Sequence, residues 1–392
     1  MLPSGPQSES EPASSPGATA DGAPSLGAPA PGAGVRRFPC GQCGARLEFE
    51  PGTRVLRCSH CGHANAVPES GEPVRELDFE QALARLEQEA PRTHAATIRC
   101  DSCAAEVDLP PNTSAGSCPF CGSPVVASES GASRIRPNAV LPFAITRDRA
   151  VELFRGWVAS RWFAPGGFRR AAFLDASISG IYLPAWTYDA EARTPYTGQR
   201  GDAYYVTHTE TVMVNGKPQV RTRQVRHVRW SRASGVVENT FDDVLVLATR
   251  SLPAPILDAL EPWDLTDATG YEESYLAGFR AETYQIDLKE GFGVACGIMR
   301  PTIEESVRAD IGGDEQRIDS MNPRYSNIRF KHVLLPVWVS AYRFNNTVFR
   351  FIVNARTGEV QGDRPWSVAK IALLVLAVLV VVGVIVAVAS SR

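Results

Sequence analysis

Eight of the nine cysteines in this chain occur as four Cys-x-x-Cys pairs between residues 40 and 121. Within each set of two pairs, 14 residues separate the pairs, and the second set repeats the first at an offset of 60. A Cys-x-x-Cys turn delivers two thiolates to one side of a tetrahedral Zn²⁺, and a second turn completes the site. The spacing therefore predicts two zinc ribbons with one structural zinc ion each. The pairs are Cys40/Cys43, Cys58/Cys61, Cys100/Cys103 and Cys118/Cys121.

Three other chemistries use paired cysteines. Structural disulfides need an oxidising compartment, and residues 1–34 show neither the basic start nor the apolar run of a secretion signal. A redox Cys-x-x-Cys normally comes singly near a βαβ pattern. Iron in a rubredoxin-like site uses the same four thiolates, so this alternative stays open. His60 and His63 flank Cys61, but four cysteines already complete a site, and we expect both histidines to be exposed.

The metal should hold each ribbon together. A ribbon of about 30 residues is too short to bury a sufficient core, so zinc would supply on the order of 10 kcal/mol of its folding free energy. We expect ribbon 1 at 37–68 and ribbon 2 at 98–128. The linker 69–97 should contain a helix from Asp78 to Ala90, because Asp78 and Gln81 resemble a capping box.

Composition bounds the rest of the chain. The 392 residues leave room for two or three domains, and the net charge of −3 gives no general attraction to nucleic acid or anionic lipid. Residues 1–36 are rich in Pro, Gly, Ala and Ser. Such a segment buries too little apolar surface to offset its chain entropy, and we expect a disordered tail.

Residues 134–364 are predicted to form an α+β domain with an antiparallel sheet. A helix is expected from Asp148 to Ser160. The segment Ile181–Asp189, which contains Leu-Pro-Ala-Trp, has a near copy at Leu334–Tyr342. These segments are either a weak internal repeat or two unrelated buried strands.

The second half of this domain is predicted from shorter patterns. Residues 241–300 should form strands and short helices, and Thr302 with Glu305 should begin a further short helix. A final meander is expected, with strands near 336–344 and 347–354.

The clearest hairpin turns at Asn215-Gly216, a type I′ turn signal. A two-residue loop would pair Val214 with Lys217, Glu210 with Arg221, His208 with Arg223 and Asp202 with Arg229. The returning strand carries a run of cations without an acid among them. They form either an anion-binding ribbon or a solvated face of the hairpin. The candidate anion-binding residues are Lys217, Arg221, Arg223, Arg226, Arg229 and Arg232.

Residues 371–389 are nineteen consecutive apolar residues, and we expect a C-terminal transmembrane helix at 368–390. At 1.5 Å per residue this run spans about 28 Å, close to the hydrocarbon core of a bilayer. The absence of an export signal and the reduced thiols that zinc requires predict a tail-anchored protein with cytoplasmic N-terminal domains. Arg364 and Lys370 before the apolar run 371–389 favour the same orientation weakly, since Arg392 follows the run.

No nucleotide-binding loop, His-Glu-x-x-His or Gly-x-Ser-x-Gly motif occurs in the sequence. Cys296 lies among small apolar residues and is expected to be a buried thiol rather than a nucleophile. An enzyme with dispersed site residues leaves no such motif, so the patterns alone leave this class open.

The chain resembles a family of uncharacterised bacterial double-zinc-ribbon, tail-anchored membrane proteins. The resemblance rests on the cysteine ribbons, on Leu141-Pro142-Phe143 and Tyr182 to Trp186, and on a block from Leu334 to Lys370. It spans about residues 37–390. Members are often labelled after the zinc-binding segment of the primosomal replication-restart helicase. Only the ribbons match that label, and because the helicase's nucleotide loop is absent here, the resemblance implies zinc and membrane attachment but not helicase activity.

These patterns favour a membrane-anchored adaptor whose ribbons recognise a protein partner. A membrane-held nucleic-acid-binding protein that uses the ribbons and the 217–232 hairpin is the first alternative. An enzyme that acts at the membrane surface from the α+β domain is the second. The patterns do not set the partner, the process or the oligomeric state.

Overall fold

The computed structural model describes residues 38–67, 74–88, 97–99, 106–108, 113–117, 124–126, 135–165, 167–168, 178–214, 217–344 and 347–390. The predicted tail, the two turns Asn215-Gly216 and Asn345-Asn346, and the four cysteines of the predicted second ribbon lie outside these residues.

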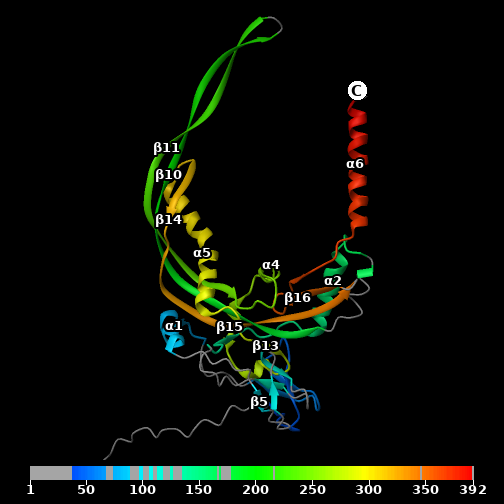
Figure 1. Cartoon of the computed structure of the whole chain (residues 1–392). Helices are drawn as coiled ribbons and strands as arrows, with labels where there is room; N and C mark the ends of the chain where they lie inside the picture. Colours follow the sequence, from blue (N-terminus) through cyan, green and yellow to red (C-terminus); the bar gives the residue numbers. More distant parts are fainter. Residues whose placement is uncertain are drawn as a thin grey trace, which may run out of the picture. The chain divides into compact units, whose positions relative to one another are not determined.

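A 12-stranded sheet is built around two long antiparallel neighbours, β10 (Ser179–Val214) and β15 (Arg324–Phe344) (Figure 1). This large sheet with helices packed on it confirms a mixed α/β fold. The strand order is β12 (Thr269–Gly270), β9 (Ala139–Val140), β15, β10, β13 (Arg280–Glu282), β7 (Thr113–Ser117) and β8 (Pro124–Val126). Beside this path, β11 (Lys217–Leu247) and β14 (Glu315–Met321) pair with β10, β4 (Leu77–Asp78) and β16 (Thr347–Asn354) pair with β15, and β17 (Val360–Gly362) pairs with β16.

The two Leu-Pro-x-Trp segments lie side by side at the centre of this sheet. They pair antiparallel with Leu183 opposite Leu335, so each copy runs past the other in the opposite direction. The indole of Trp186 donates to the carbonyl of Ile286, and the indole of Trp338 donates to that of Ile145, both at 2.9 Å. Each tryptophan therefore fastens a different connecting segment to the sheet.

Two predicted helices form close to their expected positions. Helix α1 (Phe79–Gln88) begins where Asp78 accepts a hydrogen bond from the amide of Gln81 at 2.8 Å, as the capping pattern indicates. Helix α2 (Arg147–Ser160) begins at Thr146 and buries Phe154 and Val158. Three short elements connect the strands, namely α4 (Ala254–Asp258), η1 (Leu265–Asp267) and η2 (Glu273–Leu276).

One prediction for the second half of the domain is wrong. Residues 288–311 form a single long helix, α5 (Leu288–Ile311), which begins at Asp287 and continues through Pro301 and Thr302. An interior proline costs about 3 kcal/mol. The helix nevertheless continues because it lays a buried stripe on β10 and β11, and each large side chain buried there contributes about 1.5–3 kcal/mol. That stripe is Leu288, Gly291, Ala295, Met299, Ile303, Val307 and Ile311.

Gly291 shows how closely α5 approaches the sheet. A Cβ atom at this position would lie 2.4 Å from the hydroxyl oxygen of Tyr188 and 2.9 Å from the indole of Trp186. The same Tyr188 hydroxyl donates to the carbonyl of Leu288 at 2.8 Å. A side chain at 291 would separate the helix from the strand that it covers.

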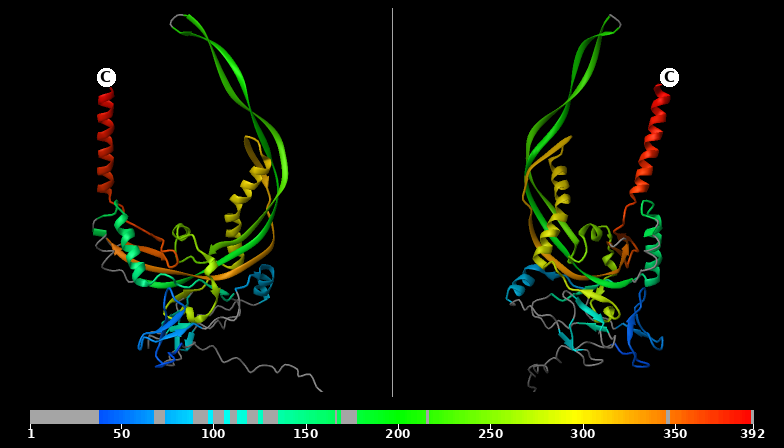
Figure 2. Two further views of the ribbon diagram at one scale, coloured as in Figure 1. Left: turned by 180° about the vertical axis from the view of Figure 1, so that it is seen from behind. Right: turned by 45° about the vertical axis from the view of Figure 1, so that its right-hand side comes forward.

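Beyond the sheet, β10 and β11 continue as a two-stranded hairpin (Figures 1 and 2). The predicted register is confirmed, with Val214 opposite Lys217, Glu210 opposite Arg221 and Asp202 opposite Arg229. The pairing of β10 with β14 ends at Gly201. We therefore call the remainder, Asp202–Val214 and Lys217–Arg229, the arm. At about 3.3 Å per residue, its 13 residues in each strand extend roughly 40 Å.

The described strands of both cysteine segments pair in the same way. In the first segment β1 (Leu47–Phe49), β2 (Val55–Cys58) and β3 (Ala64–Ala66) form a small sheet, with Val55 opposite Ala66. In the second, β7 pairs with β8 with Ala115 opposite Val126, which is the same pairing at an offset of 60. A bridge joins residues 39 and 46, and β5 (Thr97–Arg99) pairs with β6 (Glu106–Asp108) at residues 99 and 106. The 60-residue repeat in the sequence is thus also a repeat in strand register.

Helix α6 (Val368–Ser390) contains the predicted apolar run and is red in Figure 1. It is long and apolar enough to cross a membrane, and none of its apolar stretch is buried inside the protein. A soluble core helix of this length would bury at least one face.

Candidate metal centre

Two matching turns place the first four cysteines. In each turn, the amide of a glycine donates to the carbonyl of the cysteine four residues earlier, Gly44 to Cys40 at 2.8 Å and Gly62 to Cys58 at 3.0 Å. Both glycines have positive φ angles, 70° and 73°, and a Cβ atom at either would meet nothing within 4 Å. Glycine is therefore favoured at both positions because of the positive φ angle, and not because a larger side chain would clash.

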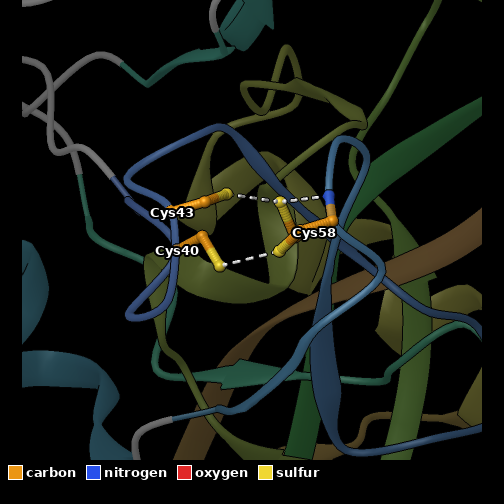
Figure 3. A group of neighbouring side chains, drawn as sticks. Cys40, Cys43 and Cys58 are labelled. Carbon is orange, nitrogen blue, oxygen red and sulfur yellow. Dashed lines mark hydrogen bonds between the residues drawn. The ribbon is translucent and has the colours of Figure 1, made fainter.

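The four thiols converge on one point, and Figure 3 labels three of them, Cys40, Cys43 and Cys58. The sulfurs of Cys40, Cys43, Cys58 and Cys61 all lie within 4.8 Å of one another, and the closest contacts are Cys43 to Cys58 at 3.5 Å and Cys40 to Cys61 at 3.6 Å. A tetrahedral ion with Zn–S bonds of about 2.3 Å separates its sulfurs by about 3.8 Å. The quartet therefore fits such an ion. His60 and His63 are exposed and do not belong to the cluster.

Backbone amides aim at the sulfurs. The amides of Gln42 and His60 donate to Cys40 Sγ and Cys58 Sγ, both at 3.4 Å. Burial raises the pKa of Cys40, but the amides of Gln42 and Cys43 and the neighbouring side chains outweigh it and lower this pKa to about 6. The Cys61 amide is the main cause that lowers the pKa of Cys58. These two sulfurs are prepared to ionise, and a dication bound among the four would favour ionisation of the others.

The ribbon also packs against the large sheet. Phe49 is buried, its ring lies 5.2 Å from that of Tyr275, and its amide donates to the carbonyl of Ala277 at 2.9 Å. The amide of Gly52 donates to the carbonyl of Phe143 at 2.8 Å. Cys40 and Cys58 belong to the same apolar cluster as these residues. The cysteine cluster is therefore attached to the main fold at its strand side and exposes its turns.

A second polar group was not foreseen from the sequence. Carboxylate oxygens of Glu76, Asp189 and Asp242 lie within 4.8 Å of one another. The ammonium of Lys331 lies 3.5 Å from Glu76 and 2.6 Å from Asp243, the residue after Asp242. Burial raises the pKa of Asp189 to about 6, although the Asp243 amide and Lys331 oppose it. Lys331, together with Arg329 at 3.9 Å from Glu76, offsets part of this negative charge, so the group is best described as an ion-pair network.

This network lies where β10 is opposed by two bulges. Asp243 on β11 and Asn327 on β15 have positive φ angles of 50° and 52°, and both pairings with β10 shift between residues 188 and 191. Bulges of this kind bend a strand and re-aim its side chains. The sequence pattern of one strand does not reveal these bulges, because each bulge depends on how the strand pairs with its neighbour.

A cleft of about 400 Å³ lies between the ribbon and the sheet. Its walls include Glu48 and Phe49 from the ribbon and Arg147, Phe279 and Trp338 from the main fold. The lining contains no histidine or cysteine. Elsewhere, burial raises the pKa of Cys296, which disfavours a nucleophilic thiolate at that position.

The six candidate anion-binding residues do not share one surface. Register places Lys217, Arg221, Arg223 and Arg229 on one face of the hairpin, and Arg226 and Arg232 on the other. Two are already engaged, since Arg226 pairs with Glu315 and the Arg229 guanidinium lies 5.5 Å from the Tyr204 ring centre. The continuous basic stripe that the sequence suggests is therefore divided.

Comparison with known proteins gives one informative similarity. The chain is 26% identical over 352 residues to the uncharacterised protein YdjG of Bacillus subtilis, covering 86% of this chain and 92% of that protein. No protein-family model matches the chain. No solved structure matches it either. The similarity extends beyond the cysteine segments but brings no assigned activity.

Proposed function

We propose that this chain is a membrane-anchored adaptor: α6 holds it to a bilayer, zinc ribbons brace the sheet, and the arm binds a protein partner. The observation that carries the proposal is the arm. A two-stranded hairpin without a third strand or a core is marginally stable in water. Twenty-six described residues are nevertheless arranged this way, counting 13 in each strand.

One face of the arm has the character of a protein-binding surface. Tyr205, Met213 and Val220 lie on the face opposite to Lys217 and Arg221. Their exposed fractions are 64%, 68% and 70%. Threonines 207, 209, 211 and 222 share this face, as does Arg226, which lies opposite Tyr205 and pairs with Glu315. Exposed aromatic and methionine side chains on a regular strand surface are enriched in protein interfaces, whereas charged residues are depleted from their centres.

The metal has a structural role in this proposal. Four cysteines leave no open coordination position, so the ion would hold the ribbon rather than act on a substrate. We propose zinc at both quartets, the second being Cys100, Cys103, Cys118 and Cys121. The strand register repeated at an offset of 60 supports the second site. Iron is the alternative for the same ligands, and elemental analysis of the purified protein decides between them.

The proposed orientation places everything before α6 in the cytoplasm. Thiolate ligands survive in a reducing compartment, and the first quartet is composed of free cysteines. Protease protection of sealed membrane vesicles tests this orientation. Cleavage of the arm from the cytoplasmic side supports it, and protection of the arm contradicts it.

Site-specific photo-crosslinking in the native cells tests the partner. A photoreactive residue replaces Tyr205 on the face that carries Met213 and Val220 and, as the matched control, His208 on the opposite face of the same strand. We expect protein adducts from position 205 that are several-fold more abundant than from 208. Equal or absent protein adducts at both positions would exclude the arm as a protein-binding surface.

A membrane-held nucleic-acid-binding protein is the second candidate, because four cations share the other face of the arm. The test is binding of duplex DNA and RNA by the detergent-solubilised chain at increasing salt. Phosphate contacts make affinity fall steeply with salt, by a log–log slope of about −0.9 per neutralised phosphate. Absence of binding at low salt removes this candidate.

A further inference from the structure

The first turn of α6 is fastened to a loop about 200 residues earlier in the chain. The Lys370 ammonium donates to the carbonyls of Trp162 at 2.7 Å and Ala164 at 2.8 Å. The amide of Ser367 donates to the carbonyl of Phe163 at 2.8 Å. Both views in Figure 2 show the end of α2 beside the start of α6. The helix therefore leaves the fold from a fixed point rather than from a free tether.

Two tryptophans are exposed at this point. Trp162 has an exposed fraction of 74%, and Trp366, two residues before α6, has 56%. The ring of Phe163 lies 6.4 Å from that of Trp366. Such exposure of tryptophan to water is unfavourable unless another medium covers it. Tryptophan is enriched at the level where a membrane protein meets lipid head groups.

Two arginines, Arg161 and Arg364, are close in sequence to these tryptophans. The guanidinium carbon of Arg161 is 4.6 Å from the ring centre of Trp157, and that of Arg364 is 4.4 Å from the ring centre of Trp366. Within the described part of the chain, neither arginine forms an ion pair. The Nε atom of Arg161 is buried and has no hydrogen-bond acceptor there. Burial, and next the nearby charge of Arg364, lowers the pKa of Arg161, although the charge of Glu359 opposes this.

We propose that the 161–165 loop and Trp366 lie in the head-group layer of the bilayer that α6 crosses, where Arg161 and Arg364 bind the phosphates of anionic lipids. This surface would hold the sheet in one orientation to the membrane. The occupant is lipid rather than a second protein, because the surface is continuous with the apolar helix and combines tryptophan with unpaired cations. The inference rests on the proposed membrane anchoring by α6.

The depth of the tryptophans tests the placement. The full chain is reconstituted into vesicles whose lipids carry bromine at shallow acyl positions, and tryptophan quenching is compared between variants. Trp162→Phe and Trp366→Phe should each remove part of the lipid-quenched emission. Trp230→Phe, a partly exposed tryptophan on β11, is the matched control and should leave it unchanged. Quenching that is the same in Trp162→Phe as in the unaltered chain overturns the proposal.

Lipid preference tests the arginines. Binding of spin-labelled phosphatidylglycerol is compared with that of phosphatidylcholine for the full chain and for the double variant Arg161→Gln/Arg364→Gln. The preference for the anionic lipid should fall about fivefold for each arginine removed. The control Arg300→Gln/Arg308→Gln removes two charges from α5 and should keep the preference. An unchanged preference in the first double variant overturns phosphate binding at this surface.

A separate experiment distinguishes failure of the proposed membrane anchor from failure of the proposed lipid-facing surface. Extraction of the membranes with alkaline carbonate releases the whole chain if α6 does not cross the bilayer, and this overturns the anchor and the surface together. Retention after carbonate, combined with unchanged quenching in both tryptophan variants, leaves the anchor intact and overturns only the surface.

Discussion

The first cysteine ribbon and the arm are both small β-structures attached to one sheet, but they are stabilised in opposite ways. The ribbon, residues 38–67, buries Leu47, Phe49 and Leu56 in the apolar cluster of the main fold. The arm, beyond Gly201, has no third strand and exposes both faces. A shared core and a cysteine quartet that fits a metal ion hold the ribbon. The arm is held by cross-strand pairs and, near its base, by contacts of Ala203 and Arg226 with Asp314 and Glu315. The comparison indicates that the ribbon supports the structure and that the arm is available for contact.

Removing the metal should give the largest effect. Cys58→Ser should lower the zinc content by one equivalent per chain and abolish amide protection over residues 47–58, because structural zinc supplies on the order of 10 kcal/mol. Elemental analysis and hydrogen exchange measure the two effects. Cys296→Ser changes the thiol outside the quartets and should retain the metal. If residues 47–58 stay protected without metal, the shared core alone holds the ribbon.

Disrupting the contact between the ribbon and the sheet should give the second-largest effect. Phe49→Ala should lower the free energy of unfolding by about 3–5 kcal/mol, because it removes a buried ring from the contact between ribbon and sheet. Tyr205→Ala on the arm should change it by no more than about 0.5 kcal/mol. Chemical denaturation of the solubilised chain measures both. Equal losses from the two substitutions would remove the distinction between the regions.

Lowering the pH should reduce the stability of the large sheet to which both the ribbon and the arm are attached. Burial lowers the pKa of His332 from 6.5 to about 4, although carbonyl oxygens near its ring oppose this. Between these values the unfolded chain binds a proton that the folded chain does not. The contribution of neutral, buried His332 to the free energy of unfolding is therefore complete above pH 6.5. It is lost as pH falls towards 4, by about 3 kcal/mol.

The variant His332→Gln should remove this dependence on pH while keeping a hydrogen-bonding group beside the carbonyl of Ile135, which lies 2.9 Å from Nδ1. Denaturation at pH 7 and at pH 4.5 compares the two chains. A slope with pH that is equally steep in the variant would assign the acid sensitivity to other groups.

The smallest expected effect is in the arm. Arg221→Glu places a second acid directly opposite Glu210. The repulsion between the two carboxylates should destabilise the hairpin by about 0.2–1 kcal/mol. Hydrogen exchange of the arm amides measures it. The exchanged pair Glu210→Arg/Arg221→Glu should recover most of the loss. No recovery would show that the residues do not act as a pair.

Local signals in this chain were sufficient for local structure. The two-residue turn determines the register of the arm, because cross-strand neighbours follow from loop length. The four cysteines of the first quartet converge as their spacing predicts, since each turn needs only its own glycine and amides. The apolar run of α6 is visible in composition alone.

The tertiary structure decided everything that required a partner element. Helix α5 continues through Pro301 because its apolar side chains are buried against the sheet, which stabilises the helix. A capping pattern at Thr302 contains no information about that sheet. The bulges at Asp243 and Asn327, and Lys331 among the carboxylates, depend on strands distant in sequence.

The contact of Lys370 with the carbonyl of Trp162 has the same origin, because 208 residues separate the two. Sequence patterns report the preferences of neighbouring residues, which suffice for turns, ligand spacing and an apolar span. Burial, charge balance and the point at which α6 leaves the fold depend on surfaces that meet only after the chain has folded.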